Sequence, residues 1–230
     1  MTSDVSDTEL VRQKYRNPHI SSLKRHPVDF FRWVLGHYHS PSEKRIEPPP
    51  HDFIYPKAIG TCSQEASKAT WIGHSTYLLE VGNIHFLTDP IFSHRSSPIR
   101  WLGPSRYEAA HLDIQDLPPI DVVLISHNHY DHLDEWSVVE LNKLYPNIQW
   151  CVPAGVKKWF TKRGFKRVTE YEWWQESTIK VPKRSHAQKV IVHFVPAQHN
   201  SGRGFFDHNR SLWGGFVVDV LVKRGDDKRF

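Results

Sequence analysis

The chain is poor in cysteine and has no long apolar run. Its 230 residues include two cysteines, Cys62 and Cys151, and no CxxC pair. This spacing predicts neither a disulfide framework nor a cysteine-ligated zinc site, and it favours a reducing compartment. No stretch approaches 18 consecutive apolar residues, and the first seven residues are polar and acidic, unlike a secretory signal. Any membrane contact is therefore expected to be peripheral.

The length and composition predict one principal globular domain. A chain of 230 residues with 39% hydrophobic content is large enough to bury a single core. The formal net charge of +5 favours an anionic partner. By charge alone this partner is an anionic membrane surface or a nucleic acid. The alternative is that the chain is simply a soluble, mildly basic protein.

The first 65 residues are predicted to form an extension before the main domain, which spans residues 66–230. Prolines at 41 and 48–50 divide the extension into short, largely irregular pieces. The aromatic segment 28–38 predicts a short helix that ends near Gly36. We interpret this segment as packing on the main domain, and insertion of its aromatic face into a lipid surface is the alternative.

A histidine-rich cluster follows a short apolar run. The run ends at Ile125, and its β-branched residues predict a buried strand. The candidate metal ligands in the next seven residues are His127, His129, Asp131 and His132. His127 and His129 are two residues apart, so on an extended backbone their rings leave the same side and can converge on one cation. The pattern indicates two adjacent ligand sets for zinc or a similar divalent ion, and a histidine-rich surface loop is the alternative.

Beyond the cluster, the pattern predicts alternating strands and helices. Residues 69–80 and 84–88 are predicted as two strands joined at 81–83, and a helix is expected after the cap residue Asp134. The apolar stripe of that helix is Val138, Leu141 and Tyr145. Shorter strands and a second helix continue to residue 171, and residues 189–196 and 212–222 are further strands. This order is typical of an α/β fold.

The sequence pattern leaves two alternatives for the arginines and the aromatic residues between these elements. Residues 93–119 are predicted to form a long surface loop, of the kind that often forms a functional lid. Its arginines, Arg95, Arg100 and Arg106, are candidates for phosphate contact or solvated charges. Trp173 and Trp174 are expected to pack in the core, with a pocket wall as the alternative.

The H-x-H-x-D-H cluster resembles the metallo-β-lactamase superfamily, and six sequence blocks in order resemble N-acylphosphatidylethanolamine-hydrolysing phospholipase D. The blocks are Trp71–Thr76, Leu87–Phe92, Leu117–Asp121, the cluster extended to Asp134, Pro196–His199 and Leu212–Gly215. The resemblance runs from Ala69 to the end of the chain. It implies the αββα sandwich of that superfamily, and we expect this chain to carry the N-terminal part of that sandwich.

The resemblance also assigns site residues outside the first four. It implies that His199 is the third histidine of the first metal site, that Tyr130 contacts substrate, and that His74 lies near the metals without being a ligand. Packing against the following helix is the alternative for Tyr130. Asp89 is a candidate to orient a metal-bound histidine, as carboxylates often do, or to cap the turn before Pro90.

The implied function is a zinc-dependent phosphodiesterase of the phospholipase D type. In the family, a hydroxide held by two zinc ions hydrolyses N-acylphosphatidylethanolamine to an N-acylethanolamine and phosphatidic acid. The implied partner is this phospholipid, with peripheral contact to intracellular membranes from the cytoplasm, no nucleic acid, and a homodimer left open. The alternatives are a metallo-hydrolase of soluble lactones or phosphodiesters, or a non-catalytic fragment that binds lipid or a partner.

The chain departs from the family pattern in two places. Asn200 stands where a tryptophan is expected. The sequence also stops at Phe230, before the family's metal-bridging aspartate and a later histidine. Asp131 and His132 alone would make a weak second site, and the unfinished sandwich would expose an apolar sheet face. We therefore expect a truncated form of a longer enzyme.

Overall fold

The computed structural model describes Tyr15 and residues 67–99, 101–106, 109–180, 187–204 and 206–222. The chain divides into two units, one of residues 1–18 and 56–230 and the other of residues 19–55. All described residues belong to the first unit. The predicted aromatic helix at 28–38 and nearly all of the predicted extension lie outside the described residues.

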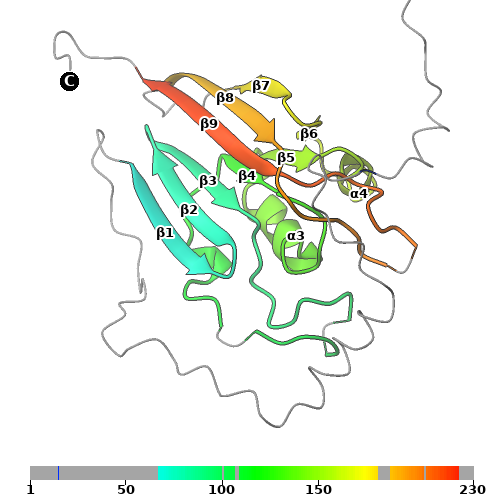
Figure 1. Cartoon of the computed structure of the whole chain (residues 1–230). Coiled ribbons are helices and arrows are strands. Elements are labelled where there is room, and N and C mark those ends of the chain that lie inside the picture. Colours follow the sequence, from blue (N-terminus) through cyan, green and yellow to red (C-terminus); the bar gives the residue numbers. More distant parts are fainter. Residues whose placement is uncertain are drawn as a thin grey trace, which may run out of the picture. The chain divides into compact units, whose positions relative to one another are not determined.

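Six strands form the larger sheet in chain order (Figure 1). They are β1 (Lys68–Gly73), β2 (Thr76–Val81), β3 (Ile84–Thr88), β4 (Val122–Leu124), β5 (Gln149–Pro153) and β6 (Val168–Tyr171). Pairs β1–β2 and β2–β3 are antiparallel, and the pairs from β3 to β6 are parallel. The carboxyl ends of β3 and β4 therefore lie side by side, with Thr88 opposite Leu124.

The prediction of one strand over residues 69–80 is wrong, because this segment is a hairpin. β1 and β2 pair with each other, and Gly73 lies opposite Thr76. Gly73 and His74 turn the chain with positive φ angles of 141° and 49°. Glycine suits this conformation, and an added Cβ at Gly73 would meet the Arg106 guanidinium. The turn places His74 at the end of the hairpin.

The helices cover one face of the large sheet. They are η1 (Ile114–Asp116), α3 (Glu135–Leu144) and α4 (Lys157–Thr161). As predicted, Asp134 caps α3, and its carboxylate accepts a hydrogen bond from the backbone N–H of Ser137. Val138 and Leu141 are buried, and the Tyr145 hydroxyl donates to the Leu117 carbonyl. The predicted apolar stripe thus holds α3 against the sheet.

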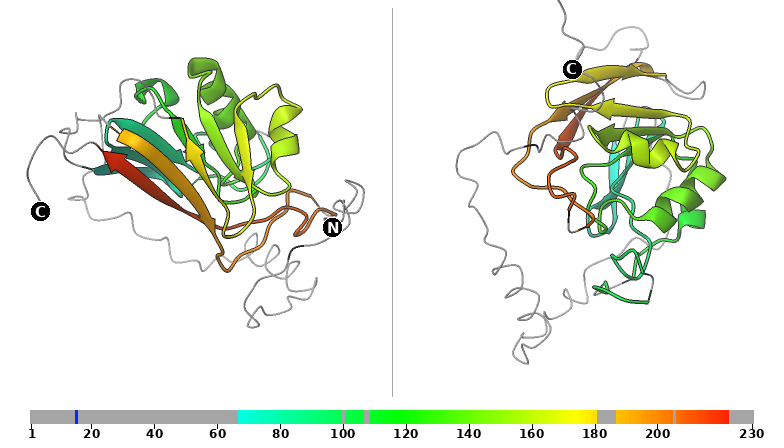
Figure 2. Two further views of the ribbon diagram at one scale, coloured as in Figure 1. Left: turned by 90° about the horizontal axis from the view of Figure 1, so that it is seen from above. Right: turned by 90° about the vertical axis from the view of Figure 1, so that its right-hand side faces the viewer.

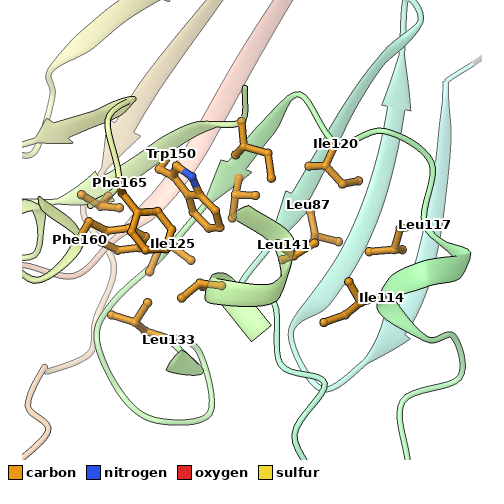
Figure 3. Close-up of a cluster of buried hydrophobic side chains, with 14 of the residues drawn as sticks. Leu87, Ile114, Leu117, Ile120, Ile125, Leu133, Leu141, Trp150, Phe160 and Phe165 are labelled. Carbon is orange, nitrogen blue, oxygen red and sulfur yellow. The ribbon is translucent and has the colours of Figure 1, made fainter. Parts of the chain in front are cut away.

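The main core lies between these helices and the sheet (Figure 3). Trp150 of β5 is fully buried, with its ring centroid 5.3 Å from that of Phe160 and 5.2 Å from that of Phe165. Leu87 of β3 and Leu141 of α3 join the same cluster. This packing fixes the sheet from which the histidine-bearing loop emerges.

A second, three-stranded sheet packs on the other face (Figure 2). Its strands are β7 (Glu176–Ile179), β8 (Ala187–Val195) and β9 (Gly215–Val222), all antiparallel. Val190, Val192 and Phe194 of β8 point into the core between the sheets. A helix layer and two sheets are the mixed α and β architecture that the metallo-β-lactamase resemblance implies. The fold-class prediction is confirmed.

The two neighbouring tryptophans have different surroundings. The Trp173 indole packs near Trp213 and donates a hydrogen bond to its carbonyl at 2.6 Å. Trp174 is 76% exposed and has a positive φ of 69°. The expected core packing therefore holds for Trp173 and is wrong for Trp174, because the turn before β7 directs the second ring to the surface.

A groove of about 450 Å³ lies between β9 and the strands β2 and β3. Its lining residues are Ser75, Leu79, Val81, Phe86, Thr88, Asp89, Leu124, Ser126, Gly215, Phe216, Val218 and Val220. On the outer face of β9, Val217 and Leu221 are exposed. Among the described helices, none is long and apolar enough to cross a membrane.

Leu141 and Leu144 on α3 provide a matched test of this packing. Leu141 is fully buried, and Leu144 is 46% exposed. We expect Leu141→Ala to lower the free energy of unfolding by about 2–5 kcal/mol through lost burial and a residual cavity. Leu144→Ala should lower it by less than about 1 kcal/mol. Urea denaturation of both variants measures this difference, and equal losses would contradict the assignment of the buried face.

Candidate metal centre

Three histidines from two loops meet at the carboxyl ends of β4 and β8. His127 and His129 follow β4, and His199 follows β8, 72 residues from His127. The Nε2 atom of His127 lies 2.8 Å from Nδ1 of His129 and 2.9 Å from Nε2 of His199. One ligand atom from each residue lies within 4.8 Å of the others. The structure thus brings the predicted first ligand set together.

A hydrogen-bond chain from Asp89 fixes the tautomer of His127. The Ser126 hydroxyl donates to Oδ2 of Asp89 at 2.7 Å, so its oxygen accepts from Nδ1 of His127 at 2.8 Å. The proton of His127 is then on Nδ1, and its Nε2 lone pair points into the cluster. Asp89 therefore orients His127 through Ser126, as carboxylates behind metal ligands do.

Burial keeps the clustered imidazoles neutral. Desolvation, together with the neighbouring histidines, lowers the pKa of His127 to about 2. Desolvation and His199 lower the pKa of His129 to about 4. A neutral imidazole has the lone pair that a metal ion needs, whereas a protonated one has none. The donor set of this cluster fits a borderline divalent cation such as zinc.

A second cluster lies beside the first. It contains His74 from the β1–β2 turn with Asp131 and His132 from the loop after β4. Oδ2 of Asp131 lies 3.2 Å from Nε2 of His74 and 3.7 Å from Nε2 of His132. The His127 and His132 ring centroids are 4.1 Å apart, so the two clusters adjoin. The sequence predicted Asp131 and His132 together, and the hairpin adds His74.

Asp89 also supports the second cluster. Its Oδ2 accepts from Nδ1 of His132 at 2.9 Å, and its Oδ1 accepts from the Ser126 backbone N–H at 2.7 Å. Burial lowers the pKa of His132, but the hydrogen bond and the charge of Asp89, with the charge of Asp131, outweigh it and raise the pKa. The carboxylate thus contacts both clusters from behind. These contacts favour the orienting role over a cap for the turn before Pro90.

The carboxylate of Asp131 stays ionised in this setting. Burial alone would raise its pKa, but the hydrogen bond from His74, with the charges of His132 and His74, lowers the pKa below its usual range. An ionised carboxylate offers an oxygen ligand to a cation. The second cluster therefore offers two imidazoles and one carboxylate.

Arg203 is a site residue that the sequence did not predict. Its Nη1 donates to the carbonyls of Asn128 at 3.1 Å and Leu133 at 2.7 Å, so it binds both ends of the ligand loop. Its Cζ lies 4.0 Å from the centroid of the Tyr130 ring. Tyr130 is therefore held beside the clusters by a cation–π contact. Its predicted contact with substrate stays a prediction.

The loop arginines are engaged in structural contacts. Arg95 donates to the Gly103 carbonyl, and Arg106 donates to the Ile91 carbonyl behind the β1–β2 turn. Burial lowers the pKa of Arg106. Arg100 lies outside the described residues. The described loop arginines thus hold the loop rather than point solvated charges outward.

The fold and the two ligand clusters are those of the metallo-β-lactamase class of metal-binding domains. The chain belongs to the β-lactamase superfamily, whose domain model, described as "Beta-lactamase superfamily domain", matches residues 85–230. This match includes all the site residues named above except His74.

Two relatives within the superfamily are named as phospholipases D. The chain is 34% identical over 214 residues to N-acyl-phosphatidylethanolamine-hydrolyzing phospholipase D 1 of Caenorhabditis elegans, covering 88% of this chain and 57% of the relative. It is 36% identical over 166 residues to the mitochondrial enzyme of that name from Saccharomyces cerevisiae, covering 68% and 33%. The predicted resemblance to this family is confirmed.

A bacterial relative is also similar. An uncharacterized protein of Mycobacterium bovis is 38% identical over 199 residues, which cover 85% of this chain and 50% of that protein. The chain spans between about a third and just over half of the length of these three relatives.

The lowered pKa of His127 predicts the acid sensitivity of the metal-free protein. Between pH 6.5 and about 2, His127 binds a proton in the unfolded chain but not in the folded one. The unfolded state then binds more protons, so stability falls on acidification, by up to about 1.4 kcal/mol per pH unit. We expect His127→Gln to reduce this slope below pH 6.5 in denaturant titrations with a chelator present. An unchanged slope would contradict the prediction.

Proposed function

We propose that this chain carries the metal-binding part of a zinc-dependent phosphodiesterase that acts on N-acylphosphatidylethanolamine. The observation that supports it most is the pair of adjoining clusters, His127–His129–His199 and His74–Asp131–His132. Two relatives with 34% and 36% identity are named for hydrolysis of this lipid. The products of water addition across the distal phosphodiester bond are an N-acylethanolamine and phosphatidic acid.

Zinc is the proposed ion because the donors are mainly imidazole nitrogens with one carboxylate. When bound, such ions activate water and neutralise charge on phosphate oxygens. The protein residues prepare this chemistry. Neutral His127 and His129 present lone pairs, Asp89 and Ser126 hold the ring of His127, and the ionised Asp131 balances cationic charge.

Tyr130 and Arg203 are the proposed substrate-side residues. The guanidinium of Arg203 packs on the Tyr130 ring, and both lie on the loops that carry the histidines. The phenol of Tyr130 can donate a hydrogen bond to an oxygen of the phosphodiester group of a phospholipid. Arg203 holds the ring in place and brings positive charge to the same side of the site.

The proposed membrane contact is the tip of the loop 94–106. Two backbone hydrogen bonds bring the arms of this loop together. The N–H of Arg106 donates to the His94 carbonyl, and the N–H of Ser96 donates to the Pro104 carbonyl. Ile99, Trp101 and Leu102 are exposed at its end, and Trp101 is 78% exposed. Tryptophan with neighbouring aliphatic residues suits the boundary between headgroups and acyl chains. We propose peripheral association with intracellular membranes from the cytoplasmic side.

The reaction is tested with the full chain loaded with zinc. We expect faster turnover of N-acylphosphatidylethanolamine in mixed micelles than of soluble phosphodiesters or lactones. His127→Ala should reduce turnover by more than about 100-fold, because even residues behind metal ligands contribute 10–100-fold. The control His193→Ala, on the second sheet, should retain activity. Preferred hydrolysis of a soluble ester would favour a different substrate, and lipid binding without turnover would contradict an enzymatic role.

The membrane contact is tested with two equally exposed tryptophans. Trp101→Ser should weaken binding to anionic phospholipid vesicles by about tenfold or more, because one buried aromatic ring contributes more than 1.4 kcal/mol. Trp174→Ser, at a site with 76% exposure, is the control and should leave binding unchanged. Vesicle sedimentation measures both. Equal effects of the two changes would contradict the proposed contact.

A further inference from the structure

The turn between β1 and β2 places a histidine at an exposed position with a positive φ. His74 has a φ of 49°, a conformation that glycine or asparagine adopts more readily. Its side chain is 46% exposed, so it contributes little to the core. A strained residue with an exposed ring is more consistent with a role at the site than with packing.

The backbone of this turn is fixed on both sides. The Trp71 indole donates to the His74 carbonyl at 2.9 Å, and the Thr88 hydroxyl donates to the Ser75 carbonyl at 2.7 Å. The Tyr77 N–H donates to the same Thr88 oxygen at 3.0 Å. The His74 ring is thus presented from a defined position, beside the end of β3 where Asp89 lies.

The ring of His74 faces the second cluster. Its Nε2 lies 3.2 Å from Oδ2 of Asp131, and its ring centroid is 5.1 Å from that of His132. Nδ1 of His132 is bonded to Asp89, and Nε2 of His132 lies 3.7 Å from the same Asp131 oxygen. Two imidazole nitrogens and one carboxylate oxygen therefore converge from two separate loops.

We propose that His74 is a direct ligand of a second divalent ion, completing with Asp131 and His132 a three-ligand site beside the His127–His129–His199 site. This assignment rests on the proposed metal-dependent function, and it deepens that proposal by adding a ligand from the β1–β2 hairpin. Three protein ligands are enough for a catalytic type of zinc site, which keeps a further position for water or substrate. The hairpin turn would then couple β1 and β2 to the metal centre.

A plain hydrogen bond between His74 and Asp131 is the competing explanation. His193 provides the comparison, since its ring lies 2.9 Å from Glu176 and 3.0 Å from Asp219 on the second sheet. These two carboxylates lie on opposite ring nitrogens, Nδ1 and Nε2. His193 is thus a histidine that is held by carboxylates but belongs to neither of the two ligand clusters found among the described residues.

The first test is metal content of the full chain after zinc loading and dialysis. We expect two ions per wild-type chain and one per chain of His74→Asn. Asparagine suits the positive φ of the turn, so the variant should remain folded, and circular dichroism checks this. Removal of a ligand should weaken the second ion by more than about 100-fold. His193→Asn should keep two ions. Two tightly held ions in His74→Asn, or a single ion in the wild type, would overturn the proposal.

The second test uses cobalt(II) and the variant His74→Cys. A thiolate that coordinates cobalt(II) gives a sulfur-to-metal charge-transfer band, which a residue that only forms hydrogen bonds cannot give. We expect this band in His74→Cys and not in His193→Cys. Its absence from both would overturn the assignment of His74 as a ligand. Neither measurement involves substrate, so loss of lipid hydrolysis with both ions retained would count against the proposed reaction and not against the ligand.

Discussion

The metal centre depends on one carboxylate, that of Asp89. It is the shared partner of the two ligand clusters, reaching His127 through Ser126 and His132 directly. Its own backbone is fixed, because its N–H donates to the Leu124 carbonyl and its carbonyl accepts from the Thr76 hydroxyl. A single side chain at the end of β3 therefore determines which nitrogen each ring directs toward the site.

The fold supports this arrangement by placing strand ends together. Parallel pairing of β3 with β4 brings Thr88 opposite Leu124, so Asp89 and the histidine loop emerge from neighbouring strands. The core on both sheet faces holds these strands, with Val123 facing the helices and Leu124 facing the second sheet. The loop after β8 then brings His199 from the second sheet. The strands fix where both ligand loops begin, and Arg203 joins the two loops through its bonds to the carbonyls of Asn128 and Leu133.

The sequence predicted those parts of the site that depend on local pattern. The β-branched run before Ser126 and the spacing of His127 and His129 were sufficient for a buried strand that ends in ligands. The cap at Asp134 and the buried stripe of α3 followed from side-chain chemistry and helical periodicity. The grouping with His199 came from family resemblance, since no local pattern links residues 72 apart.

Other parts could not be predicted because they depend on contacts between distant segments. Apolar residues stand on both sides of Gly73–Thr76, and this polar interruption was predicted as part of one strand. Arg203 lies in an irregular loop, and its bonds to the ligand loop exist only in the folded chain. Trp174 was expected in the core because of its size, but the backbone turn at its position directs it outward. Local hydrophobicity gives no information about such directions.

The groove beneath β9 has a consequence for the affinity of the metal centre. Asp89 and Ser126 line this groove and also hold the metal-facing rings from behind. Any group that enters the groove and shifts the Asp89 carboxylate changes the affinity for cations on the other side. Thermodynamic reciprocity then requires bound cations to change the affinity for that group by the same factor. Asp89 is therefore both a wall of the groove and the support of the two ligand clusters.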